Sequence, residues 1–203
     1  MRNLLLSFML WAMSGWVGAA TIVVLGDSIS AGYGLEKIDQ GWVSLLAEKL
    51  RPRGMIVVNA SISGDTSAGG LSRVDALLAQ HHPAVLILEL GGNDGLRGLP
   101  PAQMAANLGG IIDRAGAAGA QVLLLGMKIP PNYGKRYTEM FQKVYADLAG
   151  RSGVASVPFL LDGVGGVEAY MQADGIHPNR EAQSLLLEQV WNKLEPLLAG
   201  QPR

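Results

Sequence analysis

Cysteine is absent from this sequence of 203 residues. Its absence excludes disulfide bonds, thiolate metal sites and a cysteine nucleophile, and leaves the cellular compartment to be inferred from other features. Charge is also scarce, because charged residues make up 16% of the chain and the formal net charge is -1. No cluster of lysine or arginine exceeds two neighbours. We therefore expect no nucleic-acid partner.

Phosphate-binding signatures are missing as well. No Gly-x-Gly-x-x-Gly follows the first predicted strand, and no Gly-Lys-Ser or Gly-Lys-Thr occurs. These absences count against a non-enzymatic phosphate- or nucleotide-binding module, which remains the alternative function because glycine-rich loops at strand ends can also bind phosphates. Hydrophobic residues make up 49% of the chain. This content predicts a well-packed globular protein, and the length fits one domain.

The N-terminal segment has the pattern of a secretory signal peptide. Arg2 precedes an uncharged apolar run over residues 4–17, and small residues follow at 18–20. The run is shorter than the ~20 residues that span a bilayer, so a permanent anchor is the weaker interpretation. We expect a signal peptide over residues 1–20, a mature domain over 21–203, and a periplasmic or secreted monomer without a stable membrane anchor.

Apolar runs alternate with helical patterns through the rest of the chain. This alternation predicts an α/β fold with three layers, α/β/α, and a five-stranded parallel sheet in flavodoxin-like order. The second strand is predicted to be buried, and the fifth, which contains Pro158, to lie at a sheet edge. The predicted strands cover residues 22–25, 55–60, 84–90, 122–126 and 154–159. The predicted helices cover residues 42–50, 71–80, 101–118, 137–151 and 180–198.

The first strand runs into Gly26-Asp27-Ser28. Gly26 permits a sharp turn, and Asp27 suits the first turn of a following helix, where a negative charge complements the dipole. Ligands of parallel sheets gather at the carboxyl ends of the strands, so the Ser28 hydroxyl would lie at that edge. Its backbone N–H would be free to bind an anion. A serine that only caps a helix is the alternative.

Two further candidates follow the second and third strands. Gly64 has no side chain to keep its N–H away from a ligand, and the amide of Asn93 can donate a hydrogen bond to a developing oxyanion. An ordinary turn glycine and a turn-forming asparagine are the alternatives. The functional hypothesis depends on donors from three strand ends meeting at one edge of the sheet.

An acid and a histidine lie three residues apart in Asp174-Gly175-Ile176-His177-Pro178. An aspartate that orients a histidine, with the histidine reaching a serine, is the arrangement that activates a hydroxyl for acyl transfer. A loop histidine without a catalytic role is the alternative. His81 and His82 end a predicted helix, where they complement its dipole, and we assign them no catalytic role.

The connection after the fourth strand is rich in apolar and ring side chains. Ile129, Pro130 and Tyr133 are predicted to form a wall for an acyl or aromatic group. Asp65 and Gly95 are further candidates for substrate contacts. No long insertion separates the strands, so we expect an open groove without a lid.

Four sequence blocks together resemble the SGNH (GDSL-type) hydrolase family, and in particular the exported thioesterase I, arylesterase and lysophospholipase group of Gram-negative bacteria. The blocks are Gly26-Asp27-Ser28, Gly64 after Ser63, Gly91-Gly92-Asn93-Asp94 and Asp174-Gly175-Ile176-His177. One departure is Ile29, where the family name implies leucine. The similarity extends over essentially the whole mature chain.

The resemblance implies a serine esterase that forms an acyl-serine intermediate, with Ser28 as nucleophile, His177 as base and Asp174 as its orienting acid. It implies Ser28 N–H, Gly64 N–H and the Asn93 side chain as oxyanion donors. The implied substrates are carboxylic esters including aryl esters, acyl thioesters and lysophospholipids, with no metal and no cofactor. A non-catalytic binding protein of the same fold is disfavoured, because Ser28, Asp174 and His177 are all present.

Overall fold

The computed structural model describes residues 20–199, so all of the predicted signal peptide except Ala20 lies outside the described residues. Five parallel strands form one sheet in the order β2-β1-β3-β4-β5, which confirms the predicted α/β fold and strand order. The strands are β1 (Thr21–Gly26), β2 (Ile56–Asn59), β3 (Val85–Glu89), β4 (Gln121–Leu125) and β5 (Val154–Val157).

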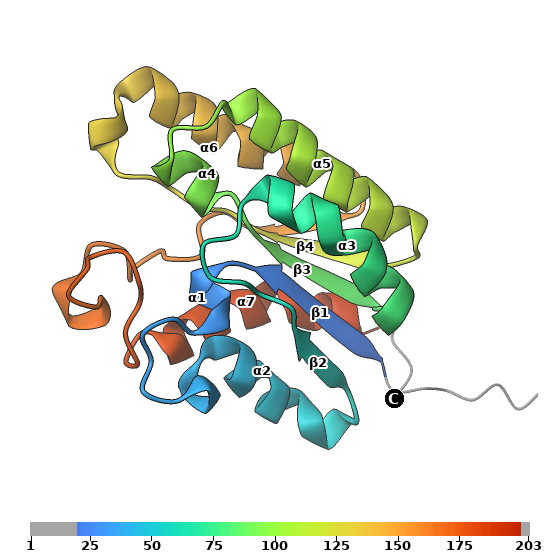
Figure 1. The fold of residues 1–203 in the computed structure, drawn as a ribbon. Helices are drawn as coiled ribbons and strands as arrows, with labels where there is room; N and C mark the ends of the chain where they lie inside the picture. Colours follow the sequence, from blue (N-terminus) through green and yellow to red (C-terminus); the bar gives the residue numbers. More distant parts are fainter. Residues whose placement is uncertain (1–19, 200–203) are drawn as a thin grey trace, which may run out of the picture.

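Helices cover both faces of the sheet and complete three layers, with α3, α5 and α6 on one face and α2 and α7 on the other (Figure 1). Among the described residues, no helix is long and apolar enough to cross a membrane. The α-helices are α1 (Ser28–Ala31), α2 (Trp42–Leu50), α3 (Ser67–His81), α4 (Gly92–Leu96), α5 (Pro101–Ala117), α6 (Lys135–Ala149) and α7 (Gln183–Leu198). The 3-10 helices are η1 (Ile38–Gln40), η2 (Arg51–Arg53), η3 (Pro131–Tyr133) and η4 (Glu168–Tyr170).

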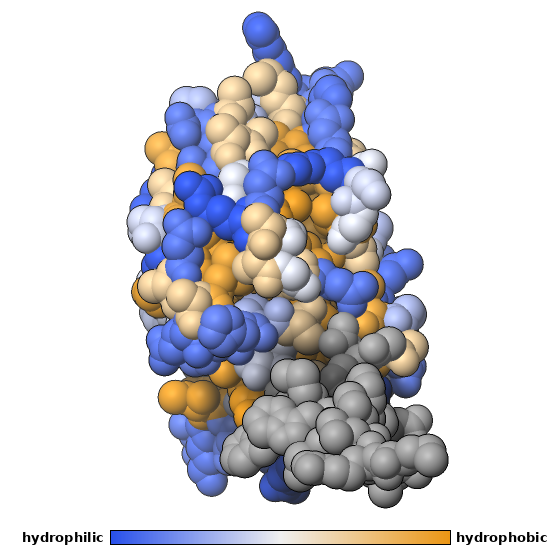
Figure 2. All heavy atoms as spheres, turned by 90° about the vertical axis from the view of Figure 1, so that its right-hand side faces the viewer, coloured by the Kyte–Doolittle hydropathy of each residue, from blue (hydrophilic) through white to orange (hydrophobic). Residues whose placement is uncertain are grey.

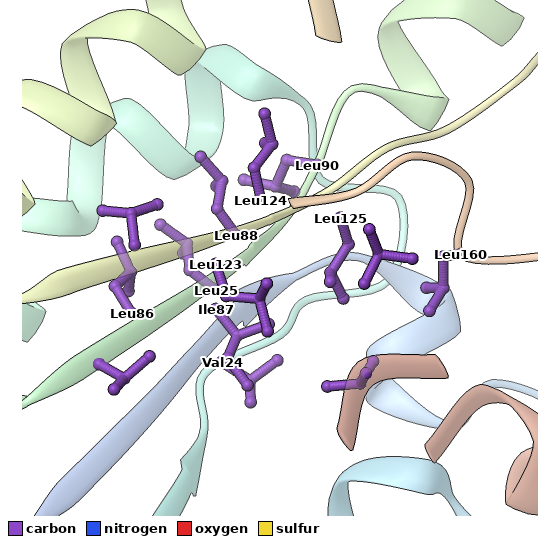
Figure 3. Close-up of a cluster of buried hydrophobic side chains, with 14 of the residues drawn as sticks. Val24, Leu25, Leu86, Ile87, Leu88, Leu90, Leu123, Leu124, Leu125 and Leu160 are labelled. Atoms are coloured by element: carbon purple, nitrogen blue, oxygen red, sulfur yellow. The ribbon is translucent and has the colours of Figure 1, made fainter. Parts of the chain in front are cut away.

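The core is formed by the three central strands, β1, β3 and β4. Their apolar side chains project from both faces of the sheet toward the two helix layers (Figure 3). Every residue of β3 is buried, including Glu89 at its carboxyl end. An uninterrupted apolar run is typical of a parallel strand that is covered on both faces.

The second strand differs from its prediction, because it lies at a sheet edge and is not buried. β2 pairs only with β1, and Ile56 is 52% exposed. An apolar run alone does not reveal whether a strand is central or peripheral. The fifth strand forms the other edge, as Pro158 predicted.

The starts of three helices also differ from the predictions, and for α6 the difference is only two residues, since it begins at Lys135. α3 begins at Ser67, four residues before the predicted start, because the Thr66 side chain caps it by accepting a hydrogen bond from the Gly69 N–H. α7 begins at Gln183, whose side-chain oxygen accepts a hydrogen bond from the Trp42 N–H. As predicted, His81 ends α3.

The strand order reverses between β1 and β3, which run side by side. Crevices at such a switch point, outside the carboxyl ends of the strands, are where open α/β sheets bind ligands. The segments that follow these strands lie on the left in Figure 1 and include α1 and α4. Figure 2 shows the opposite end, where hydrophilic and hydrophobic residues are interspersed. The predicted site residues thus converge on the end with α1.

Candidate active site

Three of the predicted residues form a continuous hydrogen-bonded chain. His177 Nε2 lies 2.9 Å from Ser28 Oγ, and His177 Nδ1 lies 2.6 Å from Asp174 Oδ2. Ser28 is the first residue of α1, which follows β1 directly, with Asp27 between them as the helix cap. This is the geometry in which an imidazole can remove a proton from a hydroxyl while a carboxylate orients the ring.

The turn that carries Asp174 and His177 is organised by Asp174 itself. Its Oδ1 accepts hydrogen bonds from the N–H groups of Ile176 (2.9 Å) and His177 (3.0 Å). The backbone N–H and the imidazole of His177, together with the Ile176 N–H, lower the pKa of Asp174 from 3.8 to about 2. The Asp174 carboxylate is therefore ionised at any pH at which His177 acts as a base.

Sequence reasoning did not find the contact between His177 and Tyr33. The two rings lie with their centroids 4.5 Å apart. Gln172 holds the Tyr33 loop against the histidine turn, since its Nε2 donates to Tyr33 O (2.8 Å) and to Pro178 O (3.0 Å). Glycine is favoured at position 34, which has φ +73°, and a Cβ there would lie 2.0 Å from Gln172 Oε1 and would displace that side chain. No periodicity marks a ring contact between segments this far apart.

The Asn93 amide joins the segments that carry the other two predicted donors. Its Nδ2 donates to Asp27 Oδ2 (3.0 Å), next to Ser28, and to Asp65 O (2.9 Å), next to Gly64. Gly64 has φ +80°, a backbone conformation that favours glycine. The structure thus brings Ser28, Gly64 and Asn93 to one place, as the strand ends predicted. Both amide hydrogens of Asn93 point at protein acceptors.

A pair of buried acids lies beneath Ser28. Asp27 is 2% exposed and Glu89 is fully buried, and the Asp27 N–H donates to Glu89 Oε2 (3.1 Å). Burial raises the pKa of Asp27 to about 6, and burial together with the nearby Asp27 charge raises the pKa of Glu89 well above its ordinary value. Sequence reasoning missed this pair, although Glu89 stood out as the charged residue of an apolar run.

Asp94, from the Gly91-Gly92-Asn93-Asp94 block, is buried, and its carboxylate bonds to Ser67. Its carboxylate accepts hydrogen bonds from both the N–H (2.8 Å) and the hydroxyl (2.5 Å) of Ser67 at the start of α3. Asn107 of α5 donates to the same hydroxyl. This buried network fastens the loop that carries Asn93 to two helices.

The predicted substrate wall needs correction at Ile129 and Gly95. Both are buried, and they pack so closely that a Cβ on Gly95 would lie 2.5 Å from Ile129 Cγ2. Neither therefore presents a free surface to a ligand. Pro130 is exposed, and Tyr133 is half-buried with its hydroxyl bonded to Leu96 O (2.8 Å).

Asp65 also has a different environment from the one we expected. Its carboxylate forms a salt bridge with Arg73 of α3 (2.7 Å) and accepts a hydrogen bond from the Thr66 N–H (2.9 Å). These bonds turn the side chain toward α3, so its backbone carbonyl, bonded to Asn93, is the part that contributes to the site.

Comparisons with known proteins identify the family of the chain. Residues 24–185 match the model of the GDSL-like Lipase/Acylhydrolase family. The chain is 56% identical to Esterase TesA of Pseudomonas aeruginosa, over 98% of this chain and 100% of that protein. It is 46% identical to Thioesterase 1/protease 1/lysophospholipase L1 of Escherichia coli K12, over 89% of this chain and 86% of that protein. A crystal structure of TesA superposes with a TM-score of 0.84 at 58% identity, covering 88% of this chain and 99% of the other.

Proposed function

The chain belongs to the GDSL-like lipase/acylhydrolase family and is a hydrolase of ester and thioester bonds. We propose that Ser28 is its nucleophile, that His177 is its general base, and that Asp174 is the acid that orients His177. The observation that carries the assignment is the unbroken hydrogen-bonded chain from Asp174 through His177 to Ser28. The phosphate-binding alternative has no support in the comparisons.

The reaction proceeds by two acyl transfers. His177 Nε2 takes the proton of the Ser28 hydroxyl as Oγ attacks the carbonyl carbon, and a tetrahedral intermediate forms. The imidazolium then protonates the leaving oxygen or sulfur, and the acyl group remains on Ser28. Water attacks this acyl-serine with His177 again as base, which releases the acid and restores the hydroxyl. Asp174 stays ionised throughout and stabilises the imidazolium.

The charge on the carbonyl oxygen is stabilised by donors from three segments. We assign this role to the N–H groups of Ser28 and Gly64 and to the side-chain amide of Asn93, which its hydrogen bonds to Asp27 and Asp65 O hold next to the Ser28 and Gly64 segments. Donors that are held in place before the reaction stabilise the transition state without a cost of reorganisation.

Aryl esters, acyl thioesters and single-chain lysophospholipids are the proposed substrates of this one site. Exposed apolar side chains occur in segments next to the triad: Tyr33 is 54% exposed, Ile62 52% and Ile176 46%. Shallow apolar surface discriminates weakly between acyl groups, because each methylene in an apolar pocket is worth only ~1–3 kcal/mol. Pro130 and Tyr133 are the remaining candidates for the acyl wall.

Export to the periplasm is proposed from the N-terminal sequence alone. The uncharged run over residues 4–17 and the small residues at 18–20 support cleavage near Ala20 or Thr21. N-terminal sequencing of protein from the native host tests it, and uncleaved protein in the membrane fraction would indicate an anchor. We also propose a monomer, which light scattering of the purified protein tests.

The triad assignment is tested by Ser28→Ala and His177→Ala. Each should lower kcat by ~10⁴-fold or more for an aryl ester, an acyl-CoA thioester and a lysophospholipid alike, because the covalent route is lost. Circular dichroism and thermal unfolding must show a folded protein. If one substrate class were still turned over at near-native rates, a second site would act on it.

A further inference from the structure

Asp27 contacts both sides of the proposed oxyanion hole. Its Oδ1 accepts a hydrogen bond from the Ile29 N–H (3.0 Å) and so caps the short helix that begins with Ser28. Its Oδ2 accepts a hydrogen bond from Asn93 Nδ2 (3.0 Å). We propose that Asp27 is a positioning residue, which fixes the Asn93 amide relative to the nucleophile and acts on catalysis through that amide. This inference rests on the proposed function, since it requires Asn93 to be an oxyanion donor.

The Asn93 amide is held from two directions. One hydrogen bond goes to Asp27, whose chain continues directly into Ser28, and the other goes to the carbonyl of Asp65, whose chain continues from Gly64. The amide therefore cannot turn without losing both bonds. When an oxyanion forms, it has to share one of these hydrogens. The position of Nδ2 is thus set by its acceptors, of which Asp27 is the charged one.

Glu89 holds Asp27 in turn. Its Oε2 accepts hydrogen bonds from the Asp27 N–H (3.1 Å) and from Ser30 Oγ (2.7 Å). Gly26 leaves the room for this oxygen, because a Cβ at position 26 would lie 2.8 Å from Glu89 Oε2. The glycine of the Gly-Asp-Ser block is therefore needed for the acid beneath it as well as for the turn.

The charges around the pair explain how it is ionised. The two acids act on each other, the charge of His177 from the catalytic turn acts on Asp27, and Tyr145 of α6 lies in the field of both acids. Burial raises the pKa of Asp27 to about 6, so Asp27 is ionised above that pH, and burial together with the Asp27 charge raises the pKa of Glu89 well above its ordinary value. An ionised carboxylate is a stronger acceptor for the Asn93 amide than a neutral one.

A purely structural cap would not require this arrangement. Burial of the Asp27 carboxylate disfavours its ionised form, whereas serine, threonine or asparagine caps a helix without that cost. Strongly shifted buried acids concentrate at functional sites. A smaller residue such as serine could cap α1 but would lack the hydrogen bond that Asp27 Oδ2 accepts from Asn93 Nδ2.

A double-mutant cycle tests the proposal with an aryl ester at pH 8. Asn93→Ala should lower kcat by ~10²- to 10³-fold, the usual cost of one oxyanion donor. Asp27→Asn keeps the shape but loses the charge, and Asp27→Ser keeps a helix cap but is too short to reach Asn93. Each should lower kcat by about 10-fold or more with KM within about twofold, because misplacement acts on the transition state. Combined with Asn93→Ala, neither should lower kcat further.

The matched control is Thr66→Ala. Thr66 caps α3 in the neighbouring loop, as Asp27 caps α1, but its hydroxyl accepts from the Gly69 N–H, whereas the Asn93 amide donates to Asp27 and to Asp65 O. It should lower the Tm while kcat stays close to native. A loss of kcat as large as that of the Asp27 variants would show that any weakened cap has this effect, and would overturn the proposal.

The failures are distinguishable. A native kcat in Asn93→Ala contradicts the oxyanion assignment, and with it the proposed function of that residue. A second outcome contradicts only the role of Asp27. In it, Asn93→Ala lowers kcat, but the Asp27 variants either keep a native kcat or lower kcat by the same factor with and without Asn93→Ala. If neither Asp27 variant folds, nuclear magnetic resonance of the native protein decides. The Asn93 side-chain amide, identified by its absence in Asn93→Ala, should shift as pH crosses about 6, and an unshifted signal would overturn the proposal.

Discussion

Two aspartates lie on either side of the Ser28–His177 pair, and they differ in almost every respect. Asp174 lies in a turn with its side chain 38% exposed, and three hydrogen-bond interactions lower its pKa to about 2. Asp27 is buried above Glu89, and burial raises its pKa to about 6. The comparison shows that burial and hydrogen-bond donors, and not residue type, decide which acid serves the histidine and which holds the amide.

Of the two aspartates, Asp174 should have the larger effect on activity when it is replaced by asparagine, and only a small effect on stability. The neutral amide cannot stabilise the imidazolium, so kcat should fall by ~10³- to 10⁴-fold. Because the turn is partly exposed, thermal unfolding should change little. Measured kcat within tenfold of native would show that His177 does not depend on this acid, and the contrast with Asp27 would disappear.

Asp27 should make a distinct contribution to the pH dependence of stability. The folded-state pKa of Asp27 lies above its ordinary 3.8, so the folded protein keeps a proton that the unfolded chain has released. The free energy of unfolding should therefore fall as pH rises from about 4 to about 6, by roughly 3 kcal/mol relative to Asp27→Asn. Urea unfolding of both proteins across this range measures the difference.

Asp174 should contribute with the opposite sign and in a lower window. Its pKa is lowered, so its contribution is present above 3.8 and is lost as pH falls through about 2. The two aspartates thus act in windows that do not overlap. A native-minus-variant difference that stayed flat between pH 4 and pH 6 would mean that Asp27 is not the buried acid that titrates.

Ile129 and Pro130 are neighbours that also differ in burial, since Ile129 is buried and Pro130 is exposed. Ile129→Trp would overpack a buried side chain that already lies close against Gly95, and should destabilise the protein by ~1–3 kcal/mol. Pro130→Ala, on the exposed side, should leave the Tm within about one or two degrees but change the preference for acyl length. Chain-length profiles of both variants, with their melting curves, separate the roles. A well-folded Ile129→Trp with an altered profile would return Ile129 to the substrate wall.

Tyr33→Leu should give the smallest effect. The ring that lies against His177 favours the imidazolium by ~0.5–1 kcal/mol, so its removal should lower kcat about two- to fivefold. Tyr33→Phe is the matched control and should retain native kcat, because the ring and not the hydroxyl makes the contact. Equal losses in both variants would point to the hydroxyl instead.

Residues whose roles follow from strand-end position or local spacing could be predicted. The placement of Ser28, Gly64 and Asn93 follows from alternating strands and helices, since the carboxyl ends of parallel strands meet at one edge. The contact between Asp174 and His177 follows from three residues of spacing in a tight turn. Both inferences use geometry that the chain carries locally.

Features that depend on packing between distant segments could not be predicted. The burial of Ile129 depends on the room that Gly95 leaves, and the exposure of β2 depends on its place in the strand order. Asp27 and Glu89 are 62 positions apart, and the local sequence around either acid does not indicate that the two pair. Glu89 in its apolar run was the one available signal.

The contact between Ser28 and His177 joins residues 149 positions apart in the chain. Gln172 holds the same two segments together, because its side chain donates hydrogen bonds to Tyr33 O and to Pro178 O. During synthesis, Ser28 therefore emerges long before the imidazole that activates it. A truncated or half-made chain carries a serine without a base, which leaves it inert toward acyl groups. The catalytic pair can therefore form only after residue 177 has been synthesised and its turn has packed against the segment that carries Ser28.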